Sequence, residues 1–361
     1  MHDRRRTLVS SADFPAFVYD LEDLDTHIRE VRSALGDIEL YYAVKANPDP
    51  ELLRVLVRYV DGLEVASGGE VAHVRDLFPN ARIAFGGPGK TDSELALAPT
   101  VYRLHVESPN EIRRLIAAGS DADILLRVNL DIPIPGASLA MGGGATPFGM
   151  DPAGVAECLD LLTGHESLRL RGIHAHLASG LGAEQMLDVA SAVLDYARSL
   201  GMTEINIGGG MAVDYSDPSR RFDWKTYGAG LAALRRPGET IRIEPGRSLT
   251  VYCGRYVTQV IDVKRVHGEL FAIVAGGTHH IRTPATKGHD QPMMIGQPGE
   301  PVTIVGQLCT PKDTLARRVP IALEVGDTVE FLMAGAYAWN ISHHDFLMHP
   351  KPAFRYVNKD L

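Results

Sequence analysis

The middle of the chain repeats one local pattern of apolar and polar positions. A short apolar run rich in β-branched residues ends in a polar or glycine-rich turn, and a stretch with helical spacing follows. The pattern occurs eight times, in the runs at residues 39–47, 62–70, 82–90, 101–109, 123–131, 170–180, 204–211 and 241–247. One intervening stretch, SPNEIRRLIAAG, opens with a Ser–Pro–Asn turn and has a glutamate in its first turn, which predicts a helix start.

Eight such units predict an α/β fold built on a (β/α)8, TIM-like barrel, whose usual size is about 250 residues. We expect this barrel to span residues 25–247. An open doubly wound sheet is the alternative, but it usually has fewer strands and carries its glycine fingerprint after the first one. Here Gly208, Gly209 and Gly210 follow the seventh run, and a phosphate site after the seventh and eighth strands is typical of barrels.

The pattern changes after residue 248. Runs such as PVTIVGQLC and GDTVEFLMAGAY alternate apolar and polar residues, and short turns separate them, as in antiparallel β structure. The strand-like run AFVYD, at residues 16–20, precedes the barrel. We therefore expect residues 1–24 and 248–361 to form a second domain, a β-barrel or β-sandwich.

Composition disfavours several classes of protein. The 361 residues carry a formal net charge of -9 without a basic stripe, which is unlike a nucleic-acid binder and unsuited to an anionic membrane surface. Three scattered cysteines form no disulfide framework, and no apolar run approaches the roughly 18 residues of a membrane span. We expect a cytoplasmic protein in a reducing compartment.

Lys45, in the run YYAVKAN, is the first candidate for chemistry. It ends the first predicted barrel strand, and barrel active sites lie at the carboxyl ends of the strands. Partial desolvation by the apolar residues before it favours formation of an imine on a lysine amine. On position alone, a surface lysine just past a strand is the simpler interpretation.

Two more motifs follow the last two predicted strands. The glycines at 208–210 let backbone amides approach a phosphate, although a plain tight turn explains them equally well. In the run EPGR, Glu244 can bind a protonated ring nitrogen and Arg247 can neutralise phosphate charge. A structural Glu–Arg pair is the alternative.

The run HAHLASG raises a different possibility. Alternation places His174 and His176 on one face of the sixth strand, and a His-x-His pair in a barrel also suits a metal-dependent hydrolase. We expect no metal site, because no further histidine or aspartate ligand is evident at neighbouring strand ends. The four motifs together suit one ligand, since they supply an imine lysine, a phosphate cradle, a ring-nitrogen carboxylate and a stacking imidazole.

These motifs resemble the fold-type III decarboxylases that use pyridoxal 5'-phosphate (PLP), the group of ornithine, arginine and diaminopimelate decarboxylases. The resemblance covers nearly the whole chain, from FVYD through YYAVKAN, LEVASGGE, HAHLASG, GGG, EPGR and GQLCTPKD to GAY. It implies an alanine-racemase-like fold, PLP as the cofactor, and a homodimer with shared active sites.

The resemblance also implies a role for each matching residue. Lys45 forms the imine with PLP, and Cys309 is the candidate proton donor. The implied cofactor contacts are Glu64 and Glu244 at the pyridine ring, Arg127 nearby, His176 on the ring face, and Ser179, Gly208, Gly209, Gly210, Gly246, Arg247 and Tyr337, most of them at the phosphate. Cys309 and Asp313 match a motif that the partner subunit contributes across a dimer interface.

The chain departs from those enzymes where they bind the distal amine of the substrate. Diaminopimelate enzymes carry a glutamate directly after the motif cysteine and ornithine enzymes an aspartate, whereas this chain has Thr310. A buried ammonium needs an anionic partner, so a free basic diamino acid is disfavoured. The segments MGGGATPFG and GGTHHIRTPATKGHDQP instead resemble the siderophore-biosynthesis branch, which decarboxylates a diamino acid that is amide-linked to citrate.

A citryl group carries several carboxylates, and a cluster of cationic and imidazole side chains suits them. The expected substrate contacts are Asp313, His279, His280, Arg282 and Lys287. A solvated loop is the alternative explanation of this cluster. The preferred function is therefore decarboxylation of a citrate-conjugated diamino acid such as citryl-diaminopropionate.

Four other functions remain as alternatives. The nearest is decarboxylation of a free diamino acid of the diaminopimelate, ornithine or lysine type. A racemase pairs the ring nitrogen with arginine, which Glu244 disfavours. A non-catalytic PLP-binding homologue is disfavoured because Lys45, Cys309 and Asp313 are all present. A metal-dependent hydrolase has the least support.

Overall fold

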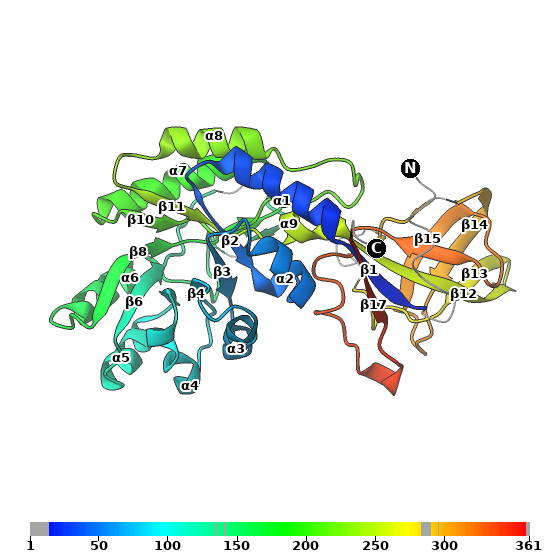
Figure 1. The fold of residues 1–361 in the computed structure, drawn as a ribbon, viewed down its shortest axis with the longest axis horizontal. Coiled ribbons are helices and arrows are strands. Elements are labelled where there is room, and N and C mark those ends of the chain that lie inside the picture. The colour runs from blue at the N-terminus through cyan, green and yellow to red at the C-terminus, as the bar shows by residue number, and fades with distance from the viewer. Residues whose placement is uncertain (1–13, 134–135, 141, 283–289, 295, 359–361) are drawn as a thin grey trace. The chain divides into compact units, whose positions relative to one another are not determined.

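The computed structural model describes residues 14–133, 136–140, 142–282, 290–294 and 296–358 (Figure 1). The chain divides into two compact units. The barrel unit comprises His27–Val213 and Arg221–Leu249, and the sheet unit comprises Met1–Thr26, Asp214–Arg220 and Thr250–Leu361. Each unit is described by itself.

The barrel unit is built on eight parallel strands that close on themselves in the order β10-β11-β2-β3-β4-β5-β6-β8. Their bounds are β2 Glu39–Ala43, β3 Gly62–Val65, β4 Ile83–Phe85, β5 Arg103–Val106, β6 Ala122–Arg127, β8 Leu168–His174, β10 Glu204–Asn206 and β11 Thr240–Ile243. Each strand coincides with one of the eight apolar runs, to within two residues at its start. The predicted (β/α)8 barrel is therefore confirmed.

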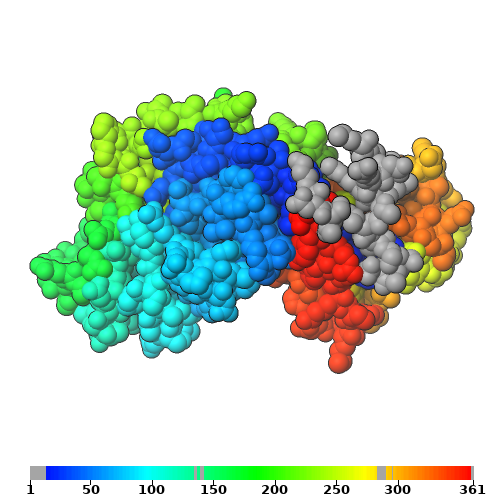
Figure 2. All heavy atoms as spheres, in the orientation of Figure 1, coloured from blue at the N-terminus to red at the C-terminus, as the bar shows by residue number. Residues whose placement is uncertain are grey.

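Helices surround these strands, and several begin with the same local signal. An aspartate or serine caps the first turn and a proline follows it, at Asp49–Pro50, Ser108–Pro109 and Asp151–Pro152. The helices are α1 Leu21–Leu35, α2 Pro50–Leu56, α3 Gly68–Leu77, α4 Asp92–Leu95, α5 Pro109–Ala117, α6 Pro152–Leu162, α7 Ala183–Ser199, α8 Trp224–Leu234 and α9 Arg247–Thr250. In Figure 2 the segments coloured blue to cyan cover the strands on the face shown.

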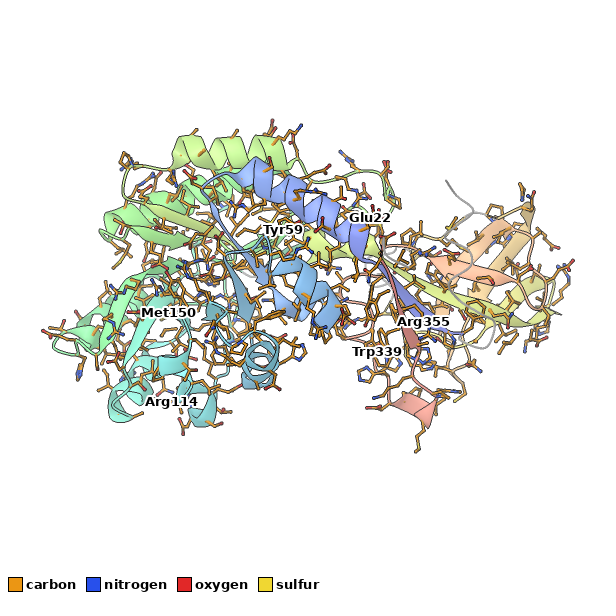
Figure 3. All side chains as sticks on the ribbon, viewed as in Figure 1. Glu22, Tyr59, Arg114, Met150, Trp339 and Arg355 are labelled. Atoms are coloured by element: carbon orange, nitrogen blue, oxygen red, sulfur yellow. The ribbon has the colours of Figure 1, made fainter. Side chains whose placement is uncertain are left out.

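Short elements complete the barrel unit. Single 3-10 turns occur at Val44–Ala46 and Ala98–Thr100. The long connection from β6 to α6 folds back, so that β7 (Leu139–Ala140) pairs antiparallel with β9 (Ala178–Ser179) just after β8. Met150, labelled beside β6 in Figure 3, ends this connection through a parallel bridge to Val128.

The interior of the barrel is polar, and it is charged at the amino-terminal end of the strands. The Arg242 guanidinium is fully buried; it donates to Glu39 Oε2 at 2.5 Å and to Glu204 Oε1 at 2.8 Å. It also lies over the Tyr41 ring, 4.6 Å from the centroid. Arg103 donates to Glu204 from a fourth strand, β5. Because buried charges must be paired, this network fixes the strands at the floor of the barrel.

The sheet unit contains seven strands among its described residues. Six follow the order β15-β14-β13-β12-β1-β17, and β16 pairs with β12. Their bounds are β1 Ala16–Asp20, β12 Gly254–Val266, β13 Glu269–Val274, β14 Pro298–Val305, β15 Thr314–Ile321, β16 Thr328–Phe331 and β17 Ala353–Val357, with 3-10 turns at Val251–Cys253 and Phe346–Met348. Stacked Phe17 and Phe354, with ring centroids 5.7 Å apart, join β1 to β17 in the core.

Two strand pairs differ from the predicted antiparallel arrangement. β13 pairs parallel with β14, and β1 pairs parallel with β17. The reason is connectivity, because a parallel pair needs a long connection. Residues 275–297 link β13 to β14, whereas β1 and β17 come from opposite ends of the chain. The AFVYD run adds a strand to this unit, as expected. Among the described helices, none is long and apolar enough to cross a bilayer.

Replacing Arg242 with methionine should destabilise the protein by about 3 to 5 kcal/mol, because Glu39 and Glu204 would keep their charges without the buried partner. Urea unfolding followed by tryptophan fluorescence measures the change. The matched control is Arg82→Met, since Arg82 also pairs with Glu39, at 3.7 Å, but with a side chain that is 53% exposed. That variant should lose less than about 1 kcal/mol. Equal losses in both variants would contradict the assignment of the buried pair.

Candidate functional site

Lys45 lies directly after β2, in the 3-10 turn at the carboxyl end of the barrel. Its ammonium is paired with Glu64 on the neighbouring strand β3, with 2.5 Å between Nζ and Glu64 Oε2. The Glu64 side chain is 7% exposed and that of Lys45 is 41% exposed. The amine is therefore held at the barrel mouth with one face still open.

The Glu64 carboxyl is poised to exchange its proton. Burial raises its pKa to about 7, Lys45 opposes that rise, and the charge of Glu244 reinforces it. A carboxyl with this pKa next to an amine can accept or return a proton near neutral pH.

Glu244 follows β11, and side chains from the next two strands hold its carboxylate. Asn206, at the end of β10, donates from Nδ2 to Oε1 at 2.6 Å. His174, at the end of β8, places Nε2 3.0 Å from Oε2. Glu244 is only 6% exposed. Each carboxylate oxygen therefore has a partner inside the barrel.

A second imidazole stacks on His174. The His105 ring from β5 lies 4.1 Å from the His174 ring between centroids, with 17° between the planes. Burial lowers the pKa of both imidazoles well below the usual 6.5; for His174 the next cause is the charge of Arg127, and for His105 it is the neighbouring His174. Both rings are therefore neutral near pH 7.

This stack corrects one expectation. No further ligand was expected beside the His-x-His pair, but His105, His174 and Glu244 bring ligand atoms within 4.8 Å of one another. Such a set could hold a metal ion by its geometry. The stacking depends on the strand order, because β5 and β8 both pair with β6. His176 is not a member of this set.

His176 contacts the glycine turn instead. Its Nδ1 accepts a hydrogen bond from the Gly209 backbone at 3.2 Å. Burial lowers the pKa of His176 to about 3, and the charges of Lys45 and Arg127 act in the same direction. The imidazole is therefore a neutral acceptor, and its tautomer carries the proton on Nε2.

The turn at 208–210 is possible only without side chains. Gly208 and Gly210 adopt φ of 71° and 115°, in the region that favours glycine. A Cβ at Gly208 would lie 2.5 Å from the Ala175 carbonyl oxygen, and one at Gly209 would lie 2.6 Å from that of Glu244. The backbone of the 208–210 turn thus passes close to Ala175 and Glu244, which follow β8 and β11. The turn itself exposes backbone atoms and no side chains.

Arg127, at the end of β6, is positioned by a buried carboxylate. It donates to Glu107 Oε1 at 2.6 Å and lies over the Phe148 ring at 5.2 Å. Glu107 also accepts hydrogen bonds from the Gly87 and Gly149 backbones. The guanidinium is therefore fixed by loops that follow three different strands.

The structure thus gathers most of the predicted cofactor residues at one end of the barrel unit. Lys45, Glu64, Arg127, His176, Ser179, Gly208, Gly209, Gly210, Glu244, Gly246 and Arg247 all belong to this unit. Ser179 pairs in β9, and its carbonyl accepts from the Ser138 backbone. Gly246 needs to be small, because a Cβ there would lie 2.8 Å from that of Ala46.

The remaining predicted residues belong to the sheet unit, and their contact with cofactor or substrate stays a prediction. Cys309 and Arg282 are exposed there, and Tyr337 has a left-handed backbone with φ of 49°. Both ring nitrogens of His280 have partners inside the unit, Tyr256 Oη and the Pro350 carbonyl. His279 is fully buried. Lys287 lies outside the described residues.

Asp313 joins two loops of the sheet unit. Its Oδ1 accepts from the backbone and the hydroxyl of Thr278, and its Oδ2 accepts from the Leu308 backbone at 2.7 Å. The side chain is 2% exposed. Asp313 therefore fixes the backbone next to Cys309, a role that its sequence position did not predict.

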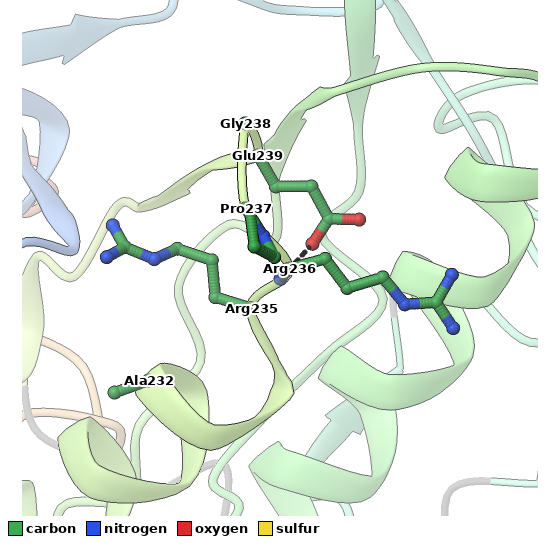
Figure 4. A pocket seen from close by; sticks show the side chains of 6 residues that line it. All are labelled: Ala232, Arg235, Arg236, Pro237, Gly238 and Glu239. Atoms are coloured by element: carbon green, nitrogen blue, oxygen red, sulfur yellow. Dashed lines mark hydrogen bonds between the residues drawn. The ribbon is translucent and has the colours of Figure 1, made fainter.

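A shallow hollow elsewhere on the barrel unit carries no comparable chemistry. It has a volume of about 360 Å³ and lies at the turn between α8 and β11, at the amino-terminal end of that strand (Figure 4). Its lining is Ala232, Arg235, Arg236, Pro237, Gly238 and Glu239. Glu239 is already held by Arg198 and by the Arg236 backbone.

Comparison with known proteins agrees with this geometry. The family described as "Pyridoxal-dependent decarboxylase, pyridoxal binding domain" matches residues 21–251. The 2-[(L-alanin-3-ylcarbamoyl)methyl]-2-hydroxybutanedioate decarboxylase of Staphylococcus aureus is 39% identical, over 95% of this chain and 94% of its own length. The L-glutamyl-[BtrI acyl-carrier protein] decarboxylase of Niallia circulans is 31% identical, over 96% and 89%.

A solved structure gives the same result for the fold. Diaminopimelate decarboxylase from Helicobacter pylori, in complex with L-lysine, superposes with a TM-score of 0.88 at 25% identity. The match covers 99% of this chain and 93% of that one.

Replacing Glu64 with glutamine should flatten the dependence of stability on pH in the ligand-free protein. The folded-state pKa, about 7, exceeds the usual 4.5, so the stabilisation that Glu64 contributes is complete below pH 4.5 and is lost as the pH rises through 7. Thermal unfolding between pH 4.5 and 8 measures this. The exposed control Glu166→Gln should keep the wild-type slope. A Glu64→Gln slope equal to wild type would contradict the shift.

Proposed function

Because the chain belongs to the pyridoxal-dependent decarboxylase family, we propose that it removes the α-carboxylate of a diamino acid that is amide-linked to citrate, in siderophore biosynthesis. The observation that carries the chemistry is the arrangement at one barrel end of Lys45, the glycine turn at 208–210 and the buried Glu244. The same family relation makes PLP the cofactor.

The residues present fit that cofactor. Lys45 would hold its aldehyde carbon, and the bare backbone turn at 208–210, with Ser179 and Arg247, would hold its phosphate. Glu244 would meet the ring nitrogen and His176 the ring face, with Arg127 beside them. When it is bound, PLP supplies an electron sink for the charge left on the substrate carbon.

The protein's own residues then have separate tasks. Glu244 holds a proton on the ring nitrogen, because an ionised carboxylate stabilises a positive charge beside it. Glu64 would take a proton from the Lys45 amine, or return it, when that amine binds or releases the cofactor. The 2.5 Å distance between Lys45 Nζ and Glu64 Oε2 allows this transfer. The reaction breaks the bond from the α-carbon to the carboxylate, releases carbon dioxide and adds one proton to the α-carbon. Cys309 is the proposed donor of that proton.

A homodimer is part of this proposal. Cys309, Asp313 and Tyr337 lie in the sheet unit, and the family resemblance assigns Cys309 and Asp313 to the active site of the partner subunit. The buried contacts of Asp313 support a positioning role for it in that arrangement, since they fix the backbone next to Cys309. We further propose that the enzyme works in the cytoplasm.

The substrate class follows from three observations. The name of the Staphylococcus aureus relative describes an alanine joined at C3 through an amide to 2-hydroxybutanedioate, which leaves two further carboxylates at the distal end. The Niallia circulans relative is also named for an acyl-linked amino acid. Thr310 stands where an acidic residue would bind a distal ammonium. A distal end that is acylated instead of cationic fits all three.

A free diamino acid such as diaminopimelate is the second candidate. Its support is the superposition on the Helicobacter pylori diaminopimelate decarboxylase, at 25% identity. The two candidates differ in the charge of the distal end, so the same assay separates them.

Purified protein should release carbon dioxide from citryl-diaminopropionate at least about tenfold faster than from diaminopimelate, ornithine or lysine, because Thr310 gives a distal ammonium no anionic partner. Lys45→Ala should lose both this activity and the visible absorbance of cofactor bonded to the lysine. Lys225→Ala, at an exposed helical position, is the control that should keep both. Faster release from free diaminopimelate would reject the citryl substrate, and absence of the absorbance from wild type would reject the PLP assignment.

A further inference from the structure

Among the residues that the structure describes, no arginine or lysine pairs with the buried carboxylate of Glu244. Its two oxygens contact the amide of Asn206 and the imidazole of His174. His105 Nε2 lies 3.8 Å from Oε1, beyond hydrogen-bonding distance. Neutral donors orient a carboxylate without supplying a positive charge to it. The carboxylate therefore stays available to a further cation.

The layer beneath Glu244 keeps it from being neutralised. Arg242 lies on β11 and Glu244 directly follows that strand, two residues later, so alternation directs both side chains into the barrel. The guanidinium of Arg242 is already engaged by Glu39, by Glu204 and by the ring of Tyr41. These contacts engage the one arginine of β11, so Arg242 is not available to pair with Glu244.

The direction of the hydrogen bond at His174 follows from the surroundings of its two nitrogens. Nε2 faces a Glu244 oxygen at 3.0 Å, whereas the buried Nδ1 has no hydrogen-bond partner among the described residues. A proton on Nε2 is bonded and one on Nδ1 is not, so His174 donates from Nε2. Other charged and titratable groups face this ring from several elements: Arg127 on β6, His176 after β8, Lys45 after β2 and Arg242 on β11. Their effect on His174 is to disfavour its cationic form. The stacked His105 ring restrains the plane of His174.

We propose that His174 and Asn206 are positioning residues that hold the Glu244 carboxylate in place and fix its direction, so that it can hold a proton on the ring nitrogen of the bound cofactor. His105 restrains the His174 ring by stacking. The inference rests on the proposed function, because it assumes that Glu244 meets the ring nitrogen. It adds two strand-end side chains, Asn206 and His174, as the groups that orient that carboxylate.

The competing role for the same side chains is a metal site. His105, His174 and Glu244 are close enough to coordinate one ion. A metal ion would require unprotonated nitrogens facing it and would occupy the oxygens of Glu244. The two roles therefore predict opposite protonation at His174 Nε2.

The first test reads the wild-type protein directly. Nitrogen-15 NMR of histidine-labelled protein without cofactor should show His174 as the neutral tautomer protonated at Nε2 from pH 6 to 8, with the signal assigned by its loss in His174→Gln. A cationic His174, or the tautomer protonated at Nδ1, would overturn the proposal. So would one zinc or iron ion per chain in the purified protein that is absent from His174→Gln.

The second test uses the cofactor-loaded enzyme with nitrogen-15 in the ring. The wild-type ring nitrogen should be protonated at pH 7. Asn206→Leu and His174→Leu should lower the pH at which it loses that proton, and kcat should fall about 10-fold to 100-fold while KM stays within about twofold. His174→Gln keeps a side-chain donor and should recover most of the loss.

Two further variants, Tyr227→Phe and His174→Gln, separate this positioning role from general damage to the fold. Tyr227→Phe removes a buried hydroxyl that has no partner among the described side chains, and it should match wild type in both readouts. A protonated ring nitrogen with kcat within about twofold of wild type in both leucine variants would overturn the positioning role. An unprotonated wild-type ring nitrogen would overturn the assignment of Glu244 in the proposed function. If the leucine variants do not fold, the wild-type tautomer measurement and His174→Gln decide alone.

Discussion

Every charged side chain that points into this barrel must find its partner on another strand, and the rest of the unit depends on that constraint. Strand alternation sends each second residue into a closed interior from which water is largely excluded. The charged ones among them are paired: Arg242 with Glu39 and Glu204, and Glu244 with Asn206 and His174. The unpaired alternative would cost several kcal/mol for each buried charge.

The pairing divides the interior into two layers with different tasks. The lower layer, centred on Arg242, is fully neutralised within itself and joins the amino-terminal ends of the strands. In the upper layer Glu244 is held by neutral donors, and the Lys45 side chain is paired with Glu64 and partly exposed. Stability therefore depends mainly on the floor, and the chemistry is concentrated at the mouth, as barrels generally arrange it.

The sequence permitted a good prediction of the fold and of part of the site. Apolar runs with polar ends located all eight strands, and the residues that directly follow strands, Lys45, the glycines at 208–210 and Glu244, were predicted for the same reason. His105, Asn206 and Glu107 were not, although the runs that contain them were recognised. Alternation marks His105 as inward-facing, but it does not say that β5 and β8 are close enough for their rings to stack.

The amino-acid sequence by itself determined the strand count, the strand ends and the residue types that stand there, because hydrophobic period and turn chemistry are local properties. Only the tertiary structure decided which of those residues meet. Strand pairing brings His105 against His174 and Asn206 against Glu244, and closure of β11 onto β2 places Arg242 between two carboxylates of other strands. Charge states such as the raised pKa of Glu64 depend on burial and on these contacts, so they exist only once the barrel has closed.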